Sequence, residues 1–344
     1  MDQAHRQTDR IIRKTEKEVS KVYAEAAKDV KAKLDDYMRR FELKDKTWQG
    51  WVKSGYKTEA QYKEWLQGQI AIGRRWEQMR DNLAHDLHNA NNIARSIVNG
   101  HSPEVYALNH DYSVYEIEHG LGVDTAYTMY DRQTVERLFG DDLVIPLNGA
   151  KDIAWQNKQV QSAMLQGILQ GEGIPDIASR IAVVTAESNR KAAIRNARTI
   201  YTGVQNAGRV DGYKRAQNMG IELEQQWVAT LDSRTRHWHR ELDGQTAPVG
   251  GYFENEFGKI RYPGDPQADP ANICNCRCTL IASLKGFARN MSDLSIRNTK
   301  HFENESYEEW KNEKESKSNP IDLPEKLSEK ERLYYLNEYK YGGV

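Results

Sequence analysis

All three cysteines of the chain fall within five residues, as Cys274, Cys276 and Cys278. The stretch around them, residues 227–280, also holds a His-x-His pair and several turns rich in glycine and proline. An odd number of cysteines at alternate positions cannot pair off into a disulfide framework. We therefore expect free thiols in a reducing compartment, within a compact and turn-rich subdomain.

The size and composition of the chain favour two domains with a modest core. At 344 residues there is room for about two domains. Only 38% of the residues are hydrophobic and 29% are charged, which favours long, partly exposed helices that complete their burial against a partner. The net charge of −1 argues against a global basic surface for nucleic acid. No apolar run approaches the roughly 20 residues of a membrane helix, and no secretory signal opens the chain.

Hydrophobic periodicity predicts helices over most of the first 219 residues. Residues 5–42 form one apolar stripe at spacings of three and four, which suits either packing on neighbouring helices or docking of a partner. Two glycines and two tryptophans are expected to break the pattern over residues 43–57. Thr58 then predicts an N-cap, and Asn99-Gly100 an end, for a second long helix. Further helices are expected at 103–119, 124–139, 151–170, 175–184 and 186–219.

The pattern changes to short period-two runs after residue 221. These runs predict strands at 222–229, 252–253, 259–262 and 278–282, separated by turns. A small antiparallel sheet covered by the preceding helices is the expected result.

The predicted fold class is therefore α+β. Long helices fill the N-terminal two-thirds, and a small antiparallel sheet subdomain with turn-rich loops and a flexible C-terminal tail follow. The expected domains are a helical region at 1–150, a mixed domain at 151–285 and a charged tail at 286–344.

The cysteine-rich stretch collects the donor types of a tetrahedral zinc site. Because alternate side chains of an extended segment point to one side, Cys276 and Cys278 can face one ion together. His239 then supplies a third ligand, and Asp232 or Asp243 a fourth. The spacing is not that of a common zinc finger, so the alternative stays open that these are small buried residues of a turn-rich subdomain.

Catalysis is a separate hypothesis for the same stretch. His237 and His239 with nearby acids could hold a catalytic metal, as in a nuclease or effector that also uses Asp232. However, the sequence contains no H-E-x-x-H, P-loop or G-x-S-x-G pattern. We therefore expect a protein that is not an enzyme.

Charged residues of the second half have structural interpretations beside functional ones. Asp232 followed by serine is typical of a side-chain-stabilised turn, and Arg234 and Arg236 can pair with carboxylates such as Asp243 or Asp265. A basic series along the 176–219 region favours either a solvated helix face or contact with DNA phosphates. Its members are Arg180, Arg190, Lys191, Arg195, Arg198 and Arg209.

An ordered set of motifs spans about residues 155–285. It reads Gly208-Arg209, Ala216-x₃-Gly220, Trp227-x-Ala229-Thr230-x-Asp232-x-Arg234-Thr-Arg236-x-x-His239-x-x-Leu242-Asp243-Gly244, Phe253 or Phe257, Tyr262-Pro263-Gly264-Asp265-Pro266 and Asn275-Cys276-Arg277-Cys278. In this order the motifs resemble the phage Mu protein F-like head morphogenesis family, the minor head proteins of tailed phages.

This resemblance implies a structural virion component inside the head near the portal, which assists assembly or DNA delivery. The implied partners are the portal protein, the major capsid or scaffold protein and packaged DNA, with no membrane segment. The implied location is the capsid interior, and the host cytoplasm during assembly. Some relatives carry separate toxin domains, and none is visible in the short tail of this chain.

The resemblance also bears on the site. It strengthens the prediction of a structural zinc ion held by His239, Cys276, Cys278 and Asp232. One departure is Cys274, where the family often has proline, and this thiol is either spare or a substitute ligand. The motif residues expected to hold the shape of the subdomain are Arg234, Arg236, Asp243, Gly244, Pro263, Gly264, Asp265 and Arg277.

Overall fold

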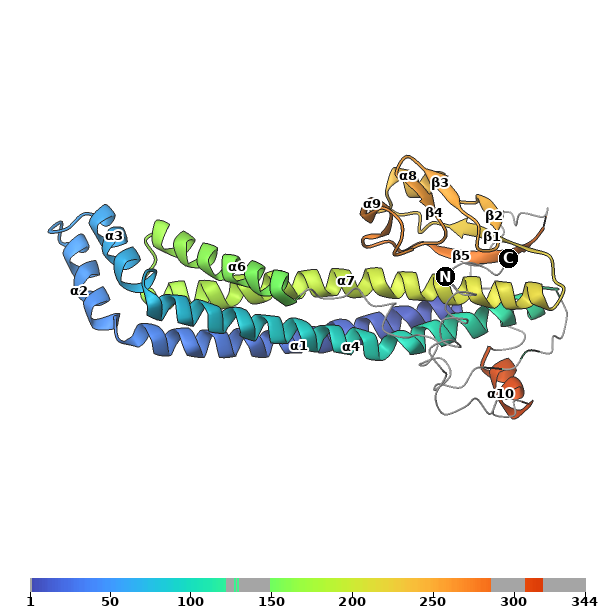
Figure 1. Cartoon of the computed structure of the whole chain (residues 1–344), viewed down its shortest axis with the longest axis horizontal. Helices are drawn as coiled ribbons and strands as arrows, with labels where there is room; N and C mark the ends of the chain where they lie inside the picture. The colour runs from blue at the N-terminus through green and yellow to red at the C-terminus, as the bar shows by residue number, and fades with distance from the viewer. Residues whose placement is uncertain (1, 122–126, 128, 130–148, 286–306, 318–344) are drawn as a thin grey trace. The chain divides into compact units, whose positions relative to one another are not determined.

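The structure is a computed structural model that describes residues 2–121, 127, 129, 149–285 and 307–317 (Figure 1). It confirms the α+β class, with long helices first and short antiparallel strands after them. The helices before the first strand are α1 (Gln3–Arg39), α2 (Glu42–Lys53), α3 (Glu59–Ile70), α4 (Arg74–Leu121), α6 (Gly149–Leu169) and α7 (Ile174–Asn218). None of the described helices combines the length and apolar character that crossing a membrane requires.

The chain divides into two compact units. The helical unit comprises Glu16–Val98 and Pro146–Ile194, and the sheet unit comprises Met1–Thr15, Asn99–Ile145 and Arg195–Val344. Helices α1, α4 and α7 each contribute residues to both units. Each unit is assembled from separate segments of the chain. The domain boundaries expected at 150 and 285 divide the chain into consecutive segments, and they stay a prediction.

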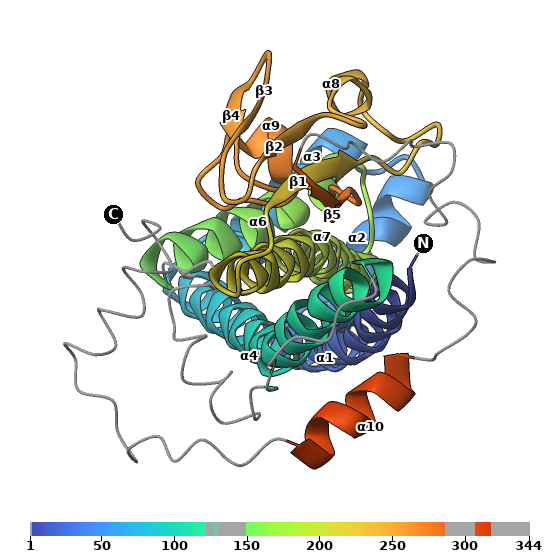
Figure 2. The ribbon, with the colours of Figure 1, turned by 90° about the vertical axis from the view of Figure 1, so that its right-hand side faces the viewer.

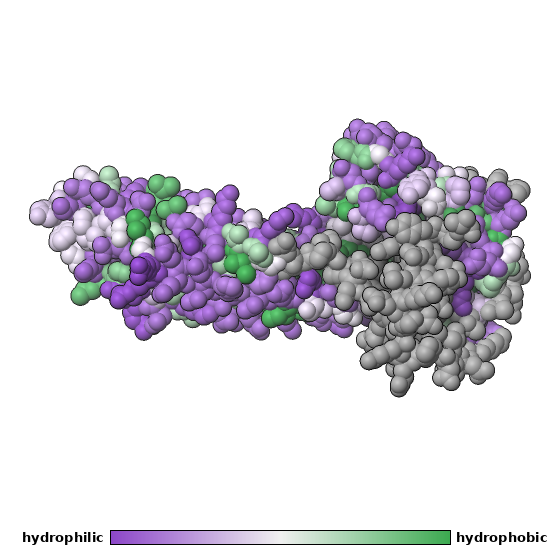
Figure 3. Space-filling view, viewed as in Figure 1, coloured by the Kyte–Doolittle hydropathy of each residue, from purple (hydrophilic) through white to green (hydrophobic). Residues whose placement is uncertain are grey.

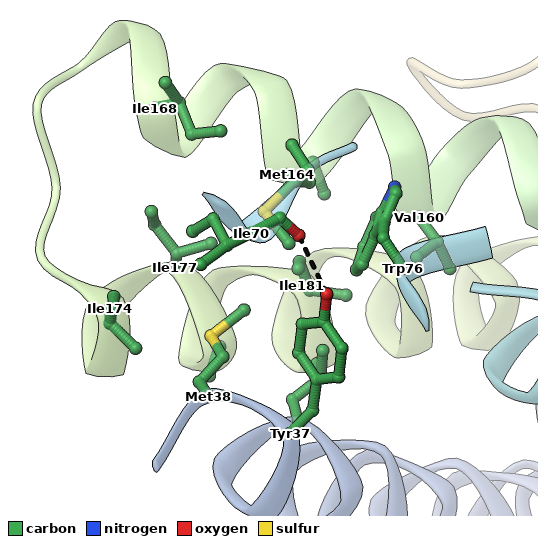
Figure 4. Packing of buried hydrophobic residues seen from close by; sticks show 14 of the residues in the cluster. Tyr37, Met38, Ile70, Trp76, Val160, Met164, Ile168, Ile174, Ile177 and Ile181 are labelled. Carbon is green, nitrogen blue, oxygen red and sulfur yellow. Dashed lines mark hydrogen bonds between the residues drawn. The ribbon is translucent and has the colours of Figure 1, made fainter. Parts of the chain in front are cut away.

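The helical unit has an apolar core built from the faces that the periodicity marked. Leu34 of α1, Leu66 of α3, Trp76 of α4, Met164 of α6 and Ile177 of α7 are all buried in one cluster, part of which Figure 4 shows. Burying one such side chain contributes roughly 1.5–3 kcal/mol. The apolar stripe of α1 therefore packs on neighbouring helices, as one of the two sequence interpretations had it.

Several predicted helix ends are wrong, because tertiary packing overrides local signals. Helix α4 runs through Asn99-Gly100 and keeps Pro103 inside it, with Val98 and Val105 buried on either side. Residues 174–218 likewise form one helix rather than two. Part of the 43–57 segment is helix α2, where Trp48 stacks on Trp65 at a centroid distance of 5.4 Å.

Other local signals are confirmed. Thr58 and Gln61 form a reciprocal capping box at the start of α3. The real break before α4 falls at Gly73, whose φ of +97° is a left-handed conformation that favours glycine. Most of the helix expected at 124–139, and residues 286–306 and 318–344 of the expected tail, lie outside the described residues.

The sheet unit contains the predicted small antiparallel sheet. Its three strands are ordered β2-β1-β5, with β1 at Leu223–Val228, β2 at Thr246–Pro248 and β5 at Thr279–Leu284. A two-stranded hairpin of β3 (Phe253–Asn255) and β4 (Gly258–Ile260) and the short helices α8 (His237–Glu241) and α9 (Pro270–Ile273) fill the connections. Figures 1 and 2 show β1 and β5 lying against α7.

A close backbone contact joins α7 to the predicted Pro263-Gly264 turn. A Cβ atom built on Gly203 of α7 would come within 2.5 Å of the carbonyl oxygen of Gly264. Gly264 also has a φ of +81°. Only glycine at both positions permits this approach, so the turn motif serves packing on the helix.

Part of the tail is ordered against α4 in the sheet unit. Helix α10 (Tyr307–Lys317) buries Trp310, whose Nε1 donates to Oε2 of Glu118 at 2.6 Å. Lys314 pairs with the other oxygen of Glu118 at 3.0 Å. This segment of the charged tail is therefore a docked helix.

A buried arginine connects four segments of the sheet unit. Arg209 of α7 is fully buried, and its Nη2 donates to both carboxylate oxygens of Asp2 at 2.9 Å. Its Nη1 donates to the carbonyl of Leu280 in β5 at 3.0 Å, and its Nε to Oδ1 of Asn109 in α4 at 3.2 Å. Arg209 was one of the candidates for DNA contact, and its burial corrects that hypothesis.

Replacing Asp2 with asparagine tests this buried pair. Burial raises the pKa of the Asp2 carboxyl, but the charges of Arg209 and His5 and the hydrogen bonds from both residues together hold that pKa below its usual value. Asparagine keeps the cap on the amide of His5 and removes the charge. We expect a loss of about 3–5 kcal/mol in the free energy of unfolding at pH 7, because a buried cation loses its counter-charge.

The pH dependence gives this prediction a sign. A carboxyl with a depressed folded pKa contributes stability above its unfolded pKa of about 3.9, and loses it as pH falls through the folded value. The gap between wild type and Asp2→Asn in urea unfolding should therefore narrow below about pH 4. Asp36→Asn in α1 is the control, since the Asp36 side chain is 79% exposed. Equal losses in the two variants would contradict the assignment.

Candidate metal centre

The loop that leaves β1 is shaped by Asp232. Its Oδ1 accepts from the backbone amide of Arg234 at 2.9 Å, which is the predicted side-chain turn. Arg277 donates hydrogen bonds to both carboxylate oxygens of Asp232, at 2.6 and 2.7 Å. The hydrogen bonds from Arg277 hold the pKa of the Asp232 carboxyl well below its usual range. The Asp232 carboxylate is therefore paired with Arg277, which lies between the two buried cysteines in sequence.

Three buried side chains of the sheet unit converge beside this loop. The Nδ1 atom of His239 on α8 lies 3.6 Å from Sγ of Cys276 and 3.5 Å from Sγ of Cys278. One donor atom from each of the three lies within 4.8 Å of the others. All three side chains are at most 3% exposed. These are three of the four ligands predicted from the sequence, and the structure brings them together.

Helix α7 and the turn after α9 fix the cysteines in place. Asn275 has a φ of +53°, and its backbone amide donates to Oγ1 of Thr199 at 3.1 Å. Thr202, one turn further along α7, donates to the carbonyl of Cys276 at 2.8 Å. Arg236 donates to the carbonyl of Cys274. The C-x-C segment is therefore held by its backbone, and its sulfur atoms are left to face His239.

Electrostatics couple the two thiols. The hydrogen bond from the Cys278 thiol lowers the pKa of Cys276, and the backbone amide of Cys278 adds to this at 3.4 Å. The same contact raises the pKa of Cys278, because a second thiolate would lie beside the first. His239 Nε2 is buried without a hydrogen-bond partner among the described residues. The group thus holds electron-rich donors close together.

Other candidate residues lie outside this group. The His237 side chain is 69% exposed and contacts Glu256 at 3.1 Å. Cys274 is half-buried and does not join the cluster of donors. Asp232 pairs with Arg277, as described above. The set of His237, His239 and Asp232 that a catalytic metal would need is therefore not assembled.

The remaining motif residues hold the local backbone. Asp243 accepts from the amide of Ala229 at 2.8 Å, and Gly244, with a φ of +85°, donates its amide to the carbonyl of Trp227 at 2.8 Å. Asp265 binds Arg261 at 2.6 and 2.9 Å.

The arginine partners therefore differ from those expected. The predicted pairing of Arg234 or Arg236 with Asp243 or Asp265 is not formed. Arg234 turns to Asp232 at 3.8 Å instead.

A polar face of α7 is the feature that sequence reasoning missed. Thr199, Thr202, Asn206 and Arg209 follow each other at spacings of three and four and are all buried. The Oδ1 atom of Asn206 accepts from the amide of Leu280 at 3.0 Å, at the start of β5. Polar residues at helical spacing on one face were the available signal, since buried polar groups need partners.

The basic series on α7 is largely compensated by acids. Arg180 pairs with Glu172, and Arg190 pairs with Glu187 at 2.7 Å. Lys191 lies 3.5 Å from the same Glu187. Paired charges release fewer counterions from DNA, so this face favours the solvated-helix interpretation.

Replacing Asp232 with alanine tests the loop. We expect faster amide hydrogen exchange across residues 229–236, because the turn and the two contacts with Arg277 disappear together. In the wild type the protection of this loop is present above the unfolded pKa of an aspartate, about 3.9. It is lost as pH falls through the folded pKa of Asp232, which is depressed. Glu241→Gln, at an exposed position on α8, is the control. Unchanged exchange in Asp232→Ala would refute the role of this side chain.

Comparison with known proteins agrees with the family that the motifs indicated. Residues 158–281 match the family model described as Phage Mu protein F like protein. Over 319 residues the chain is 25% identical to the minor head protein GP7 of Bacillus phage SPP1, covering 90% of this chain and 95% of that protein. It is also 30% identical over 154 residues to the NAD(+)--arginine ADP-ribosyltransferase EFV of Enterococcus faecalis, covering 44% of this chain and 31% of that protein. No solved structure matches. The chain therefore resembles the phage Mu protein F-like family over residues 158–281 and a minor head protein over most of its length.

Proposed function

We propose that this chain is a structural protein of a phage head, a minor head protein that acts in head morphogenesis. The observation that carries this proposal is the similarity to a minor head protein along nearly its whole length, 95% of that relative. The finer parts of the proposal are a position inside the capsid at or near the portal and a part in DNA delivery. Its partners would be the portal, the major capsid or scaffold protein and packaged DNA, after assembly in the host cytoplasm.

The surface of the helical unit supports a role in an assembly. Leu43, Tyr56 and Ile72 are each more than 60% exposed around α2 and α3. Trp51 contacts Tyr56 at a ring-centroid distance of 5.8 Å, so part of this apolar surface is continuous. Figure 3 shows such apolar patches on helices that are otherwise polar. Exposed apolar clusters of this kind are typical of surfaces that become buried against another protein.

The match to the ADP-ribosyltransferase supports a shared module rather than a shared activity. It spans only 31% of that protein, and the activity in its name is a property of that protein. The rival hypothesis of a metal-dependent nuclease is not favoured either. His237 and Asp232 both have other partners, Glu256 and Arg277. We therefore propose a role without catalysis.

Mass spectrometry of purified virions and empty procapsids tests the structural role. We expect the chain in the particles, at a copy number far below that of the major capsid protein and comparable to that of the portal. Deleting the gene should change particle composition and lower infectivity. A chain missing from both particle types, together with unchanged infectivity after deletion, would refute the proposal.

Incubation with DNA tests the rivals. We expect intact double-stranded DNA after incubation of the purified chain with Mg²⁺ or Zn²⁺. Cleavage that disappears in His239→Ala would instead support the nuclease. For the proposed contact with packaged DNA, the affinity should fall as salt rises, because phosphate contacts release counterions. An affinity that does not depend on salt would remove DNA from the list of partners.

A further inference from the structure

We propose that His239, Cys276 and Cys278 bind one zinc ion, which crosslinks α8 to the turn that leads into β5. This inference concerns the isolated chain and does not depend on the proposed role in the phage head.

The distances between the donor atoms fit a tetrahedral ion. Zinc binds thiolate sulfur at about 2.3 Å and imidazole nitrogen at about 2.0–2.1 Å. At tetrahedral angles these bond lengths separate nitrogen from sulfur by about 3.5 Å. The observed separations from His239 Nδ1 are 3.6 Å to Cys276 and 3.5 Å to Cys278. Only small shifts are then needed to admit the ion.

The chemistry of the donors selects the ion. Thiolate sulfur is a soft ligand that suits zinc, and hard ions such as Mg²⁺ and Ca²⁺ prefer oxygen. A zinc ion compensates the charge of two thiolates that would otherwise repel each other. The hydrogen bonds from Cys278 lower the pKa of Cys276 most. The charges of the Arg236 and Arg277 guanidinium groups lower it by less.

A simple hydrogen-bonded cluster explains the arrangement less well. Only one nitrogen of His239, Nδ1, faces the sulfur atoms, and it lies nearly equidistant from both. One N–H group cannot point at two acceptors with good geometry. A single ion at that point satisfies all three donors at once.

The fourth position of the ion is left for water. Within the described residues the group contains three possible ligands and no more. Asp232 is held by Arg277, and Asp243 accepts from the amide of Ala229. Cys274 lies outside the group. All three ligands are buried, so the ion would be enclosed within the sheet unit, where it would crosslink the folded chain.

The ion would connect segments that are distant in sequence. His239 lies 37 residues before Cys276, and the hairpin β3-β4 and helix α9 fall between them. Because the metal site forms only in the folded chain, the free energy of metal binding adds to the free energy of folding. Removing the ion should therefore loosen α8 and the turn before β5.

Metal analysis of the full chain tests the proposal. The chain is purified under reducing conditions without metal-affinity resin, and zinc is counted by mass spectrometry. We expect about one zinc per chain in the wild type and in the control Cys274→Ser. The double variant Cys276→Ser/Cys278→Ser should retain less than about a tenth of that. A strong chelator should lower the thermal midpoint of the wild type and of Cys274→Ser by about 5 °C or more, and leave that of the double variant unchanged.

Cobalt substitution keeps the test decisive if the double variant fails to fold. Co²⁺ added to the metal-free wild type should give a thiolate-to-cobalt charge-transfer band that saturates at about one ion per chain and disappears when zinc is added. No saturable band in folded wild type would overturn the proposal. So would zinc that stays bound in a folded double variant. Absence from virions would refute the head proposal and leave these readouts untouched.

Discussion

The buried guanidinium of Arg209 is the interaction on which the sheet unit depends. A guanidinium without water is tolerated only when its donors are paired, and here it binds Asp2, Asn109 and the carbonyl of Leu280. These partners lie directly before α1, in the C-terminal third of α4 and in strand β5. One side chain of α7 therefore fixes the positions of two helices and the sheet relative to each other within this unit.

The same face of α7 positions the candidate metal centre. Thr199 and Thr202 bind the backbone around Asn275 and Cys276, and Asn206 binds the first residues of β5. These polar contacts set the path of the C-x-C segment, and the sulfur atoms then meet His239 from α8. The face of α7 thus holds the backbone of this loop in place through hydrogen bonds. This arrangement suits a subdomain that keeps its shape within an assembly.

Sequence reasoning reached the fold class and the family because they rest on features that act locally. Hydrophobic period, the Thr58 capping box and the turn glycines each depend on a few neighbouring residues. Helix α4 could not be predicted as one element, since Asn99-Gly100 is a local stop signal that only the burial of Val98 and Val105 overrides. The convergence of His239 with the cysteines was predicted from donor chemistry. The hydrogen bonds with Thr199 and Thr202 of α7 that hold the cysteine segment could not be predicted, because tertiary contacts decide which partner a buried threonine finds.

Amide hydrogen exchange in Asn206→Ala tests most directly whether the polar face of α7 holds the sheet. The account predicts much faster exchange at Leu280 and along the rest of β5, because the amide of Leu280 loses its acceptor and the strand loses its attachment to α7. Exchange in the core of the helical unit, for example at Met164 and Ile177, should stay as in the wild type. Unchanged protection along β5, or a uniform increase across both units, would contradict the account.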